Sequence, residues 1–302
     1  MTWRIIVVAA AINLWLPALV RSDEPSIAEI VLNLRKAETT VASLNFCVDA
    51  HHESWHRPED ENIAFRLDRS ADVSWEIRSD GSIRKEAISR LSNVGDTRTI
   101  RKYNQFELSV FGKPRGLARY AIWSIEGSVP RSVRDQSGSS PMGSDNPFYL
   151  IGLSKGSSVS ETLTRAGAVL IDKTTLEGRA VHVLQTNPSG LAGRGWSFYS
   201  QIWVDAERST LVRRKSYIRN SNSQAWQLDR QISCKQFEEC CNGELWLPRH
   251  VHTWDYYLSD DGQQVKGGES HFAFGRWQAV PELSDDRFDV SFEFVDSKLN
   301  TR

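Results

Sequence analysis

The sequence predicts a mainly β protein with a few helices, built on an antiparallel sheet. Apolar and polar side chains alternate through most of the chain, for example at Val73, Trp75 and Ile77. Short turn sequences such as Asp80-Gly81 join the alternating segments, whereas parallel strands would need crossovers of about a dozen residues or more. Only two stretches show the apolar spacing of a helix.

The first residues have the composition of an export signal. Arg4 precedes an apolar run from Ile5 to Val20, and Arg21-Ser22 then leads into acidic residues. We expect a cleavable signal peptide at residues 1–22, and the alternative is an uncleaved anchor helix. No cysteine ends the apolar run, which argues against a lipid-anchored N-terminus. The mature protein is therefore expected in the periplasm of a bacterium, or secreted.

Composition excludes several classes of protein. Of 302 residues, 40% are hydrophobic and 25% are charged, which excludes a disordered chain and a multi-span membrane protein. The 37 basic and 38 acidic residues give a net charge of -1, so no general attraction to nucleic acid is expected. We expect residues 23–302 to form a single domain.

Two helices are predicted, and each begins at a serine–glutamate capping box. Ser26 and Glu29 open a helix that runs to Val41. Its apolar stripe consists of Ile27, Ile30, Val31, Leu34, Ala37 and Val41. Ser158 and Glu161 open a shorter helix that ends near Ala166.

The strands are predicted from alternation and turn signals, in chain order. In the N-terminal half they are Leu44–Trp55, Ile63–Asp68, Val73–Arg78, Ser82–Ser89 and a strand around Phe106–Val110. In the C-terminal half they are Ala168–Thr174, Arg179–Thr186, Trp196–Val204, Thr210–Arg219, Trp226–Phe237, Leu245–Leu258, Gln263–Phe274 and Phe288–Val295. Glu177-Gly178, Asn242-Gly243 and Asp261-Gly262 supply turns.

Residues 127–147 interrupt this pattern. Twelve of these twenty-one residues are Gly, Ser or Pro, a composition that predicts a long surface loop. A domain linker is the alternative. We favour a loop within one domain, because neither flank has a complete set of strands and helices of its own.

Several predicted strands carry large apolar side chains on both faces. In Leu245–Leu258, Trp246 and Trp254 share one face while Leu247 and Val251 share the other. Burial of both faces would explain this pattern, and so would a curved sheet whose concave face binds an apolar ligand. The residues we expect to line such a cavity are Ile30, Leu34, Phe65, Trp75, Trp203 and Trp254.

Several short sequence motifs resemble those of a known protein family. The helix and meander are followed by Gln201–Glu207 (Gln-Ile-Trp-Val-Asp-Ala-Glu) with Leu211–Arg214, then by Asn242–Pro248 (Asn-Gly-Glu-Leu-Trp-Leu-Pro) and the terminal Phe288–Phe292 (Phe-Asp-Val-Ser-Phe). In these phrases and in strand order, the mature chain resembles secreted bacterial proteins related to the LolA/LolB-type outer-membrane lipoprotein-sorting carriers.

The resemblance implies an incomplete antiparallel β-barrel wrapped around the N-terminal helix, with the shorter helix as a lid. It also implies a non-enzymatic protein that binds a lipid or an acylated protein in an apolar cavity. This chain is longer than the compact carriers, and no single arginine matches their gating arginine. One alternative function is a protein-binding or sensor module of the same fold that recognises an envelope protein. Another is a hydrolase with an unrecognised site.

The four cysteines are expected to meet an oxidising compartment. At least one disulfide is therefore predicted among Cys47, Cys234, Cys240 and Cys241, with Cys240 or Cys241 as one partner. A Cys234–Cys240 bridge needs a bend, because six residues of straight strand span about 20 Å. Pairing of Cys47 with Cys240 or Cys241 is the alternative. No Cys-x-x-Cys pair favours zinc.

Residues with catalytic or metal-binding chemistry do not form a coherent set. The sequence contains neither a Gly-x-Ser-x-Gly turn nor a phosphate-binding glycine-rich loop. His51, His52 and His56 cluster, and His250 and His252 are spaced for a common metal. We favour the simpler interpretation that they are polar residues on half-exposed strands. We therefore predict no catalytic residue, no metal and no cofactor.

Overall fold

The computed structural model describes residues 25–56, 66–94, 100–112, 117–124, 130–137, 146–154, 158–191, 195–220, 225–258 and 264–288. Its helices are α1 (Ile27–Ser43), α2 (Pro147–Leu150) and α3 (Val159–Ala166), with the 3-10 helix η2 (Asp285–Arg287). The N-terminal strands are β1 (Asn45–His56), β2 (Arg66–Ile77), β3 (Ile83–Val94), β4 (Ile100–Gly112), β5 (Leu117–Ser124) and β6 (Pro130–Ser137). The others are β7 (Ala168–Leu176), β8 (Arg179–Thr186), β9 (Ser189–Leu191), β10 (Trp196–Asp205), β11 (Leu211–Asn220), β12 (Gln227–Cys240), β13 (Leu245–Leu258) and β14 (Gln264–Val280).

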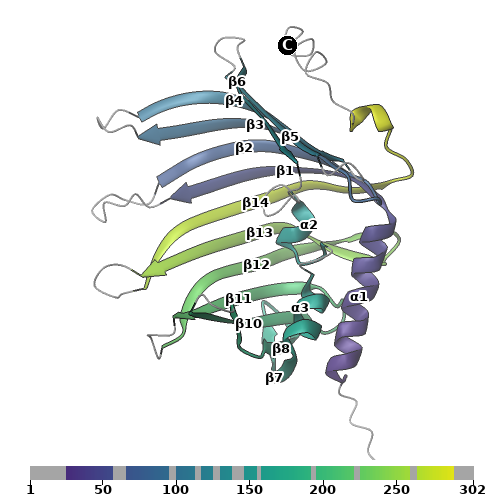
Figure 1. Ribbon diagram of the computed structural model, residues 1–302. Coiled ribbons are helices and arrows are strands. Elements are labelled where there is room, and N and C mark those ends of the chain that lie inside the picture. The colour runs from purple at the N-terminus through teal and green to yellow at the C-terminus, as the bar shows by residue number, and fades with distance from the viewer. Residues whose placement is uncertain are drawn as a thin grey trace, which may run out of the picture.

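All of these strands belong to one curved antiparallel sheet (Figure 1). The order across it is β6-β5-β4-β3-β2-β1-β14-β13-β12-β11-β10-β8-β7, and β9 pairs with β10. β6 and β7 are the outer strands, and in the described part of the chain no ladder joins them. The sheet is therefore an incomplete antiparallel barrel with helices on one side, as the sequence and its resemblance implied.

Both predicted capping boxes mark helix starts. At α1, the Glu29 backbone N–H donates to Ser26 Oγ (3.2 Å), and the Ser26 N–H donates to Glu29 Oε2 (2.6 Å). At α3, Ser158 Oγ accepts from the Glu161 N–H. The apolar stripe of α1 faces the sheet, which buries Ile30, Leu34 and Val41. This arrangement confirms the two predicted helices.

The first meander differs from the prediction. The predicted strands Ile63–Asp68 and Val73–Arg78 are not separate, because β2 continues from Arg66 to Ile77 without a turn. No glycine or proline lies between the two predicted strands, and Leu67 and Val73 have the same position in the two-residue alternation, so the chain has no reason to reverse there. Residues 57–65, which include Ile63 and Phe65, lie outside the described residues.

The predicted surface loop at residues 127–147 contains structure. Pro130–Ser137 form β6, which pairs with β5, and Pro147 begins α2. The prediction of a structureless loop is therefore wrong for these residues. An outermost strand needs hydrogen bonds on one side only, so it tolerates an initial proline and several serines. Residues 127–129 and 138–145 lie outside the described residues.

The C-terminal half follows the prediction more closely. β8 and β13 have the predicted bounds, and the Glu177-Gly178 turn joins β7 to β8 with both residues at positive φ (52° and 79°). The Asp261-Gly262 turn lies outside the described residues, as does the predicted strand Phe288–Val295 after its first residue.

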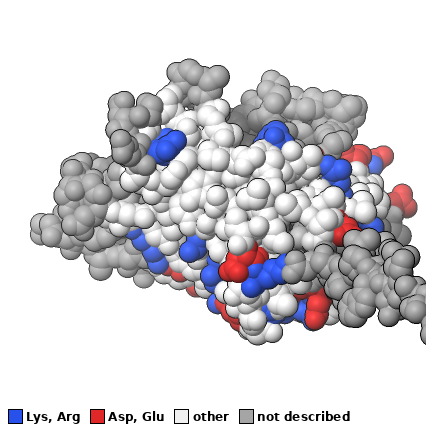
Figure 2. Space-filling model, turned by 90° about the horizontal axis from the view of Figure 1, so that it is seen from below, with Lys and Arg blue, Asp and Glu red and all other residues white. Residues whose placement is uncertain are grey.

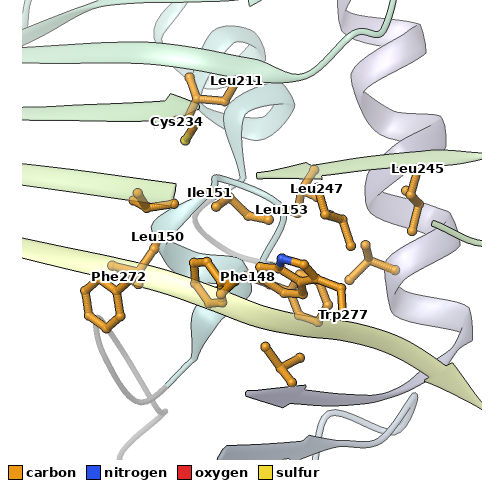
Figure 3. Packing of buried hydrophobic residues seen from close by; sticks show 14 of the residues in the cluster. Phe148, Leu150, Ile151, Leu153, Leu211, Cys234, Leu245, Leu247, Phe272 and Trp277 are labelled. Atoms are coloured by element: carbon orange, nitrogen blue, oxygen red, sulfur yellow. The ribbon is translucent and has the colours of Figure 1, made fainter. Parts of the chain in front are cut away.

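The main core lies between the helices and the concave face of the sheet. The Phe148 ring of α2 meets the Phe46 ring of β1 edge-on, with centroids 5.0 Å apart, and the Trp277 ring of β14 at 5.4 Å (Figure 3). Trp277 Nε1 donates to the Pro248 carbonyl oxygen (2.9 Å). The helices add Ile30, Leu34, Leu150, Val159 and Leu163 to the same cluster.

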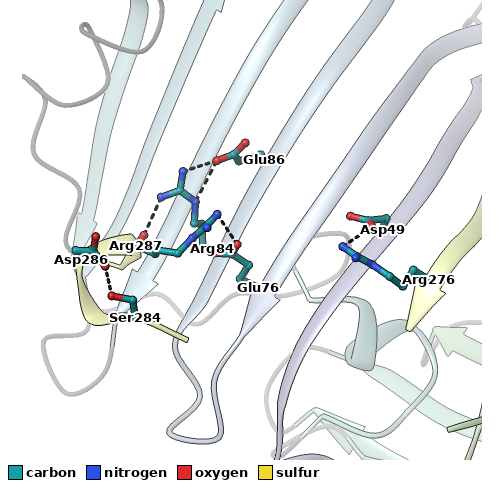
Figure 4. A network of polar contacts seen from close by, with 8 residues as sticks. All are labelled: Asp49, Glu76, Arg84, Glu86, Arg276, Ser284, Asp286 and Arg287. Atoms are coloured by element: carbon teal, nitrogen blue, oxygen red, sulfur yellow. Dashed lines mark hydrogen bonds and ion pairs between the residues drawn. The ribbon is translucent and has the colours of Figure 1, made fainter. Parts of the chain in front are cut away.

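A C-terminal segment, residues 281–288, crosses the outer face of β2 and β3. Arg287 Nη2 lies 2.5 Å from Glu76 Oε1, and the Arg287 carbonyl oxygen accepts from Arg84 Nη1 (2.8 Å) (Figure 4). Arg84 also forms an ion pair with Glu86. These contacts cover the outer side of β2 and β3 around Glu76 and Arg84.

Candidate functional site on the concave face

Strand register identifies the concave face of β1 to β4. Directly paired residues lie on the same face, so Phe46, Ile77, Ile83 and Phe111 form one row across it. Val48, Trp75 and Lys85 belong to the next row, about 7 Å further along the strands. Ala50, Val73, Ala87 and Glu107 follow, and then His52, Ala71 and Ser89.

A cavity of about 530 Å³ opens at the end of this face, between α1, the β2–β3 turn and the residues after α2. We call it the rim cavity. Its apolar lining is Val41, Ala42, Ile77, Ile83, Phe111, Phe148 and Leu153. Polar residues also line it, among them Glu38, Arg78, Asp80 and Asn146. This size and this mixture are typical of a site for a small ligand.

The β2–β3 turn and the α1–α3 contact define the edges of the rim cavity. Gly81 takes a positive φ (87°) in the turn, and its N–H donates to the Arg78 carbonyl oxygen (2.9 Å). On the other side, Glu38 of α1 accepts from the backbone N–H (3.0 Å) and hydroxyl (2.5 Å) of Ser160. The carboxylate therefore holds the N-terminus of α3 against α1.

Buried charges occupy the concave face beyond the rim cavity. Lys85 is 3% exposed and Glu107 is 7% exposed, and Lys85 Nζ lies 2.9 Å from Glu107 Oε1. Arg69 Nη2 donates to Glu107 Oε2 (3.2 Å) and to Ser89 Oγ (2.8 Å). Together with His52, we call these residues the polar niche.

Electrostatics in the polar niche favour the ionised form of Glu107 and the neutral form of His52. Burial raises the pKa of the Glu107 carboxyl, but the adjacent Lys85 and Arg69 outweigh this effect and hold the pKa below its ordinary value. Burial, together with the positive charges of Arg69 and Lys85, lowers the pKa of His52 to about 3. His52 is therefore neutral near pH 7, and the described side chains of the niche carry two cations and one carboxylate.

Two buried nitrogen atoms beside these charges lack a hydrogen-bond partner within the described residues. They are His52 Nε2 and Trp75 Nε1. His52 is 8% exposed, its ring stacks on Phe272 with centroids 4.0 Å apart, and Trp75 is directly opposite Lys85. A buried polar atom without a partner costs free energy.

The six residues predicted to line a cavity do not lie together. Ile30, Leu34 and Trp75 are buried in the main core rather than in the lining of the rim cavity. Phe65 lies outside the described residues. Trp203 and Trp254 alternate with buried inward residues, and they are therefore on the outer face. The prediction for these two was wrong because aromatic residues on both faces hide which face is inward.

Sequence reasoning missed the polar niche, although a signal for it exists. Lys85 and Ser89 share the alternation of Ile83 and Ala87, and Arg69 shares that of Val73 and Trp75. Charged residues in phase with core residues on adjacent strands predict either a buried ion pair or a site.

The cysteines do not form the pairs considered from the sequence. All four are free thiols in the structure. Cys234 and Cys240 lie six residues apart on the continuous strand β12, whereas Cys47 is on the outer face of β1 with β13 and β14 between it and β12. Burial raises the pKa of the Cys234 thiol to about 12. The sulfur atoms of Cys240 and Cys241 lie 3.2 Å apart, so a bridge between these neighbours stays a prediction.

The histidines are divided between the two faces. His52 points inward, while His51 lies on the outer face with its Nδ1 2.8 Å from Asp72 Oδ1, beside a groove of about 440 Å³. On the same outer face, His250 Nδ1 lies 3.0 Å from His271 Nε2. No group of three or more His, Cys, Asp or Glu residues that could hold a metal ion occurs in the described part of the chain.

β7 is an edge strand of the sheet, because among the described strands it pairs with β8 alone. Val169 and Ile171 of this strand are each 46% exposed. The molecule seen from below has uncharged residues over the centre of that face and charged residues toward its rim (Figure 2). Among the described helices, none has the length and apolar character needed to cross a membrane.

Comparisons with known proteins give similarities of fold. No protein-family model and no curated protein sequence matches this chain. Similar solved structures include a DUF1329 family protein from Desulfovibrio piger (13% identity, 88% of this chain and 98% of that one, TM-score 0.48). A domain described as an outer-membrane lipoprotein-sorting protein from Vibrio parahaemolyticus (10%, 86% and 97%, TM-score 0.44) and a LolA superfamily protein from Nitrosomonas europaea (13%, 86% and 96%, TM-score 0.41) are also similar. The resemblance noted in the sequence thus has counterparts among solved structures, at identities and TM-scores that assign no function.

Proposed function

We propose that this protein is a non-enzymatic, exported binder of a lipid or of an acylated protein, and that the rim cavity holds the acyl chain. The observation that carries the proposal is a cavity of about 530 Å³ whose sheet side consists of apolar residues. Cavities of roughly 300–1,000 Å³ hold small ligands in other proteins. The resemblance to lipoprotein-sorting carriers, in which an incomplete barrel encloses acyl chains, supports the same conclusion.

Export rests on residues 1–22, which have the composition of a signal peptide. The N-terminal sequence of the protein recovered from the periplasm should begin at Asp23. A protein that retains residues 1–22 would contradict cleavage, and recovery with the membrane fraction would support an anchor helix instead.

The binding proposal is tested with a fluorescent fatty acid and folded protein freed of co-purified lipid. We expect saturable binding at micromolar concentration, which corresponds to about 8 kcal/mol. Ile83→Trp should fill the rim cavity and weaken binding about tenfold. Ile88→Trp is the matched control, because Ile88 is on the same strand but is exposed on the outer face. Phe111→Ala enlarges the cavity and should also change affinity.

A protein-binding module is the second candidate function. The observation in its favour is the edge strand β7, which pairs only with β8 within the described residues and carries the exposed Val169 and Ile171. An extended segment of another protein can pair with such an edge strand. The fatty-acid experiment separates the two functions. If the folded, lipid-free wild type binds no fatty acid, the carrier proposal is rejected in favour of protein binding.

A further inference from the structure

We propose that the outer face of β10 and β11 docks the protein onto the surface of an anionic lipid membrane. This inference goes beyond the proposed function, because it concerns the opposite face of the sheet and does not need the rim cavity. Three observations carry it: cations without carboxylate partners, aromatic rings interleaved with them, and the lack of a cavity among these residues. We call this surface the basic–aromatic stripe, and its residues are Tyr199, Trp203, Arg213, Lys215, Tyr217, Arg219 and Trp226.

Strand register places the basic–aromatic stripe on the outer face. Trp203 lies between Ile202 and Val204, which are buried inward residues of β10, so Trp203 points outward. Residues of β11 that pair directly with outward residues of β10 share this face. They are Arg213 opposite Trp203, Lys215 opposite Gln201, Tyr217 opposite Tyr199 and Arg219 opposite Ser197. The stripe is about 20 Å long, because each residue of a strand advances about 3.3 Å.

The three cations of the stripe contact aromatic rings instead of carboxylates. Arg213 Cζ and Lys215 Nζ each lie 5.9 Å from the centroid of the Trp203 ring, and Arg219 Cζ lies 4.5 Å from that of Trp226. β11 contains no Asp or Glu, and in the described part of the chain none of the three cations forms an ion pair. An aromatic ring attracts a cation but does not neutralise it, so the stripe presents three positive charges.

Acidic residues at the Trp203 end of the stripe are matched by other cations. They are Asp205 with Arg179 (3.1 Å), Glu177 with Lys235 (2.9 Å), and Glu207 with its chain neighbour Arg208. These carboxylates therefore leave the charge of the stripe in excess. A surface with several unbalanced charges of one sign attracts a partner of the opposite sign.

The aromatic residues of the stripe suit the boundary between water and lipid. The Tyr199 ring stacks on Tyr217 with centroids 4.6 Å apart, and it meets the Trp226 ring edge-on at 4.7 Å. Burial raises the pKa of both tyrosines, so neither adds negative charge. Trp and Tyr combine an apolar ring with a polar tip, and together with Lys and Arg they are typical of protein surfaces that contact membrane interfaces.

A lipid surface fits the stripe better than a protein partner does. Protein interfaces rich in Trp, Tyr and Arg are centred on well-packed pockets. Neither the rim cavity nor the groove on the outer face is lined by a residue of the stripe. A bilayer is flat and repeats its negative charge along its surface, so one membrane can balance all three cations at once. Each Lys or Arg near an anionic membrane strengthens binding about fivefold.

The test is cosedimentation of the folded protein with vesicles of phosphatidylcholine, with or without phosphatidylglycerol. Wild type should bind the anionic vesicles about a hundredfold more tightly, and added salt should weaken this binding because ions screen exposed charges. Arg219→Gln should weaken it about fivefold, and the triple variant with Arg213→Gln and Lys215→Gln about a hundredfold. The matched control is Arg90→Gln, because Arg90 is an exposed cation of β3 in the other half of the sheet. It should bind like wild type.

Equal binding of wild type to the two kinds of vesicle overturns the inference, and so do equal losses for Arg219→Gln and Arg90→Gln. Soluble poly-glutamate tests the other occupant. If wild type binds it as tightly as anionic vesicles, and Arg219→Gln weakens both equally, the stripe recognises an acidic protein and the inference is wrong. The proposed function is tested separately: Ile83→Trp should keep vesicle binding, and the triple variant should keep fatty-acid binding. Circular dichroism checks that each variant is folded, and the salt dependence of wild type needs no variant.

Discussion

The concave face has two regions with opposite chemistry. Over β14 and β1, helices cover the sheet, and the inward residues are large and apolar, such as Phe46, Phe274 and Trp277. Over β2 to β4, the inward residues beyond the rim cavity include small and charged ones, such as Ala87, Lys85 and Glu107, beside the apolar Val73 and Trp75. Both regions belong to the same sheet, so strand architecture alone does not decide their chemistry.

The difference shows what each region is suited to do. Where α1, α2 and α3 supply apolar atoms, close packing fixes the structure. Where small side chains lie beside paired charges, ion pairs and hydrogen bonds take a larger share in holding the sheet. The first region should therefore respond to the loss of apolar volume, and the second to the loss of a charge partner.

The largest expected loss of stability comes from breaking the ion pairs of Glu107 in the second region. Glu107→Gln leaves two cations without their carboxylate, and it should lower the free energy of unfolding by roughly 3–5 kcal/mol in chemical denaturation. The matched control is Glu177→Gln, because Glu177 pairs with Lys235 at the same 2.9 Å but on the surface, where about 0–1 kcal/mol is expected. Equal costs for the two substitutions would mean that the niche is hydrated.

The next largest effect is expected from a mutation in the packed region. Leu34 is 1% exposed in the core beneath α1, and Leu34→Ala should cost about 2–5 kcal/mol of unfolding free energy. Leu32, 54% exposed on the same helix, provides the control: Leu32→Ala should change stability by less than about 0.5 kcal/mol. Equal changes of unfolding free energy in the two variants would contradict close packing of Leu34 beneath α1.

Sequence patterns predicted the packed region better than the niche. Capping boxes and an apolar stripe predicted α1 and α3, because the hydrogen bonds and side-chain spacing that define a helix are local in sequence. Trp203 and Trp254 could not be assigned to a face, because alternation defines two faces but does not say which one the helices cover. The small residues and charges of the niche come together only through the register of β1 to β4.

The sequence analysis also failed to predict the edge strand β6. The composition of residues 127–147 predicted no ladder, yet β6 forms there by pairing with β5. A strand that pairs on one side has weaker requirements for its sequence. The alternation pattern also did not distinguish one long strand, β2, from two short ones, although no glycine or proline separates the two predicted strands.

A pH measurement sharpens the comparison through His52. In the folded protein its pKa is about 3, while in the unfolded chain it is near 6.5, so the unfolded state binds more protons between these values. The stabilisation is therefore complete above pH 6.5 and is lost as pH falls. From pH 6.5 to 5, wild type should lose roughly 1 kcal/mol of unfolding free energy per pH unit more than His52→Gln.

The measurement is kept above pH 5 so that Glu107 stays ionised. The pKa of Glu107 is lowered in the folded protein, so its contribution to stability is lost only at lower pH. Above pH 7, where His52 is neutral in both states, the slopes of the two proteins should agree. Identical slopes below pH 6.5 would show that His52 is protonated in the folded protein, and the niche would then hold more positive charge than proposed.

The smallest effect concerns the covalent state of the cysteines, which also differ by region. Cys234 is buried in the packed core, Cys47 lies on the outer face, and Cys240 and Cys241 meet at a turn with their sulfur atoms 3.2 Å apart. Oxidised glutathione can accept two electrons from this pair and leave as two thiols, while Cys240 and Cys241 lose two protons and form one S–S bond. A bridge between neighbours encloses no loop, so stability should change little.

Mass spectrometry after alkylation of the denatured, unreduced protein checks this prediction. We expect two alkylated thiols, Cys47 and Cys234, and a linkage between Cys240 and Cys241. Cys241→Ser should then show three alkylated thiols, whereas Cys47→Ser should keep the linkage and show one. Burial and the hydrogen bond to Cys240 raise the pKa of the Cys241 thiol to about 12, so the bridge should form slowly and more readily at alkaline pH. Four alkylated thiols in protein recovered from an oxidising compartment would contradict the bridge and leave the turn to be held by its hydrogen bonds alone.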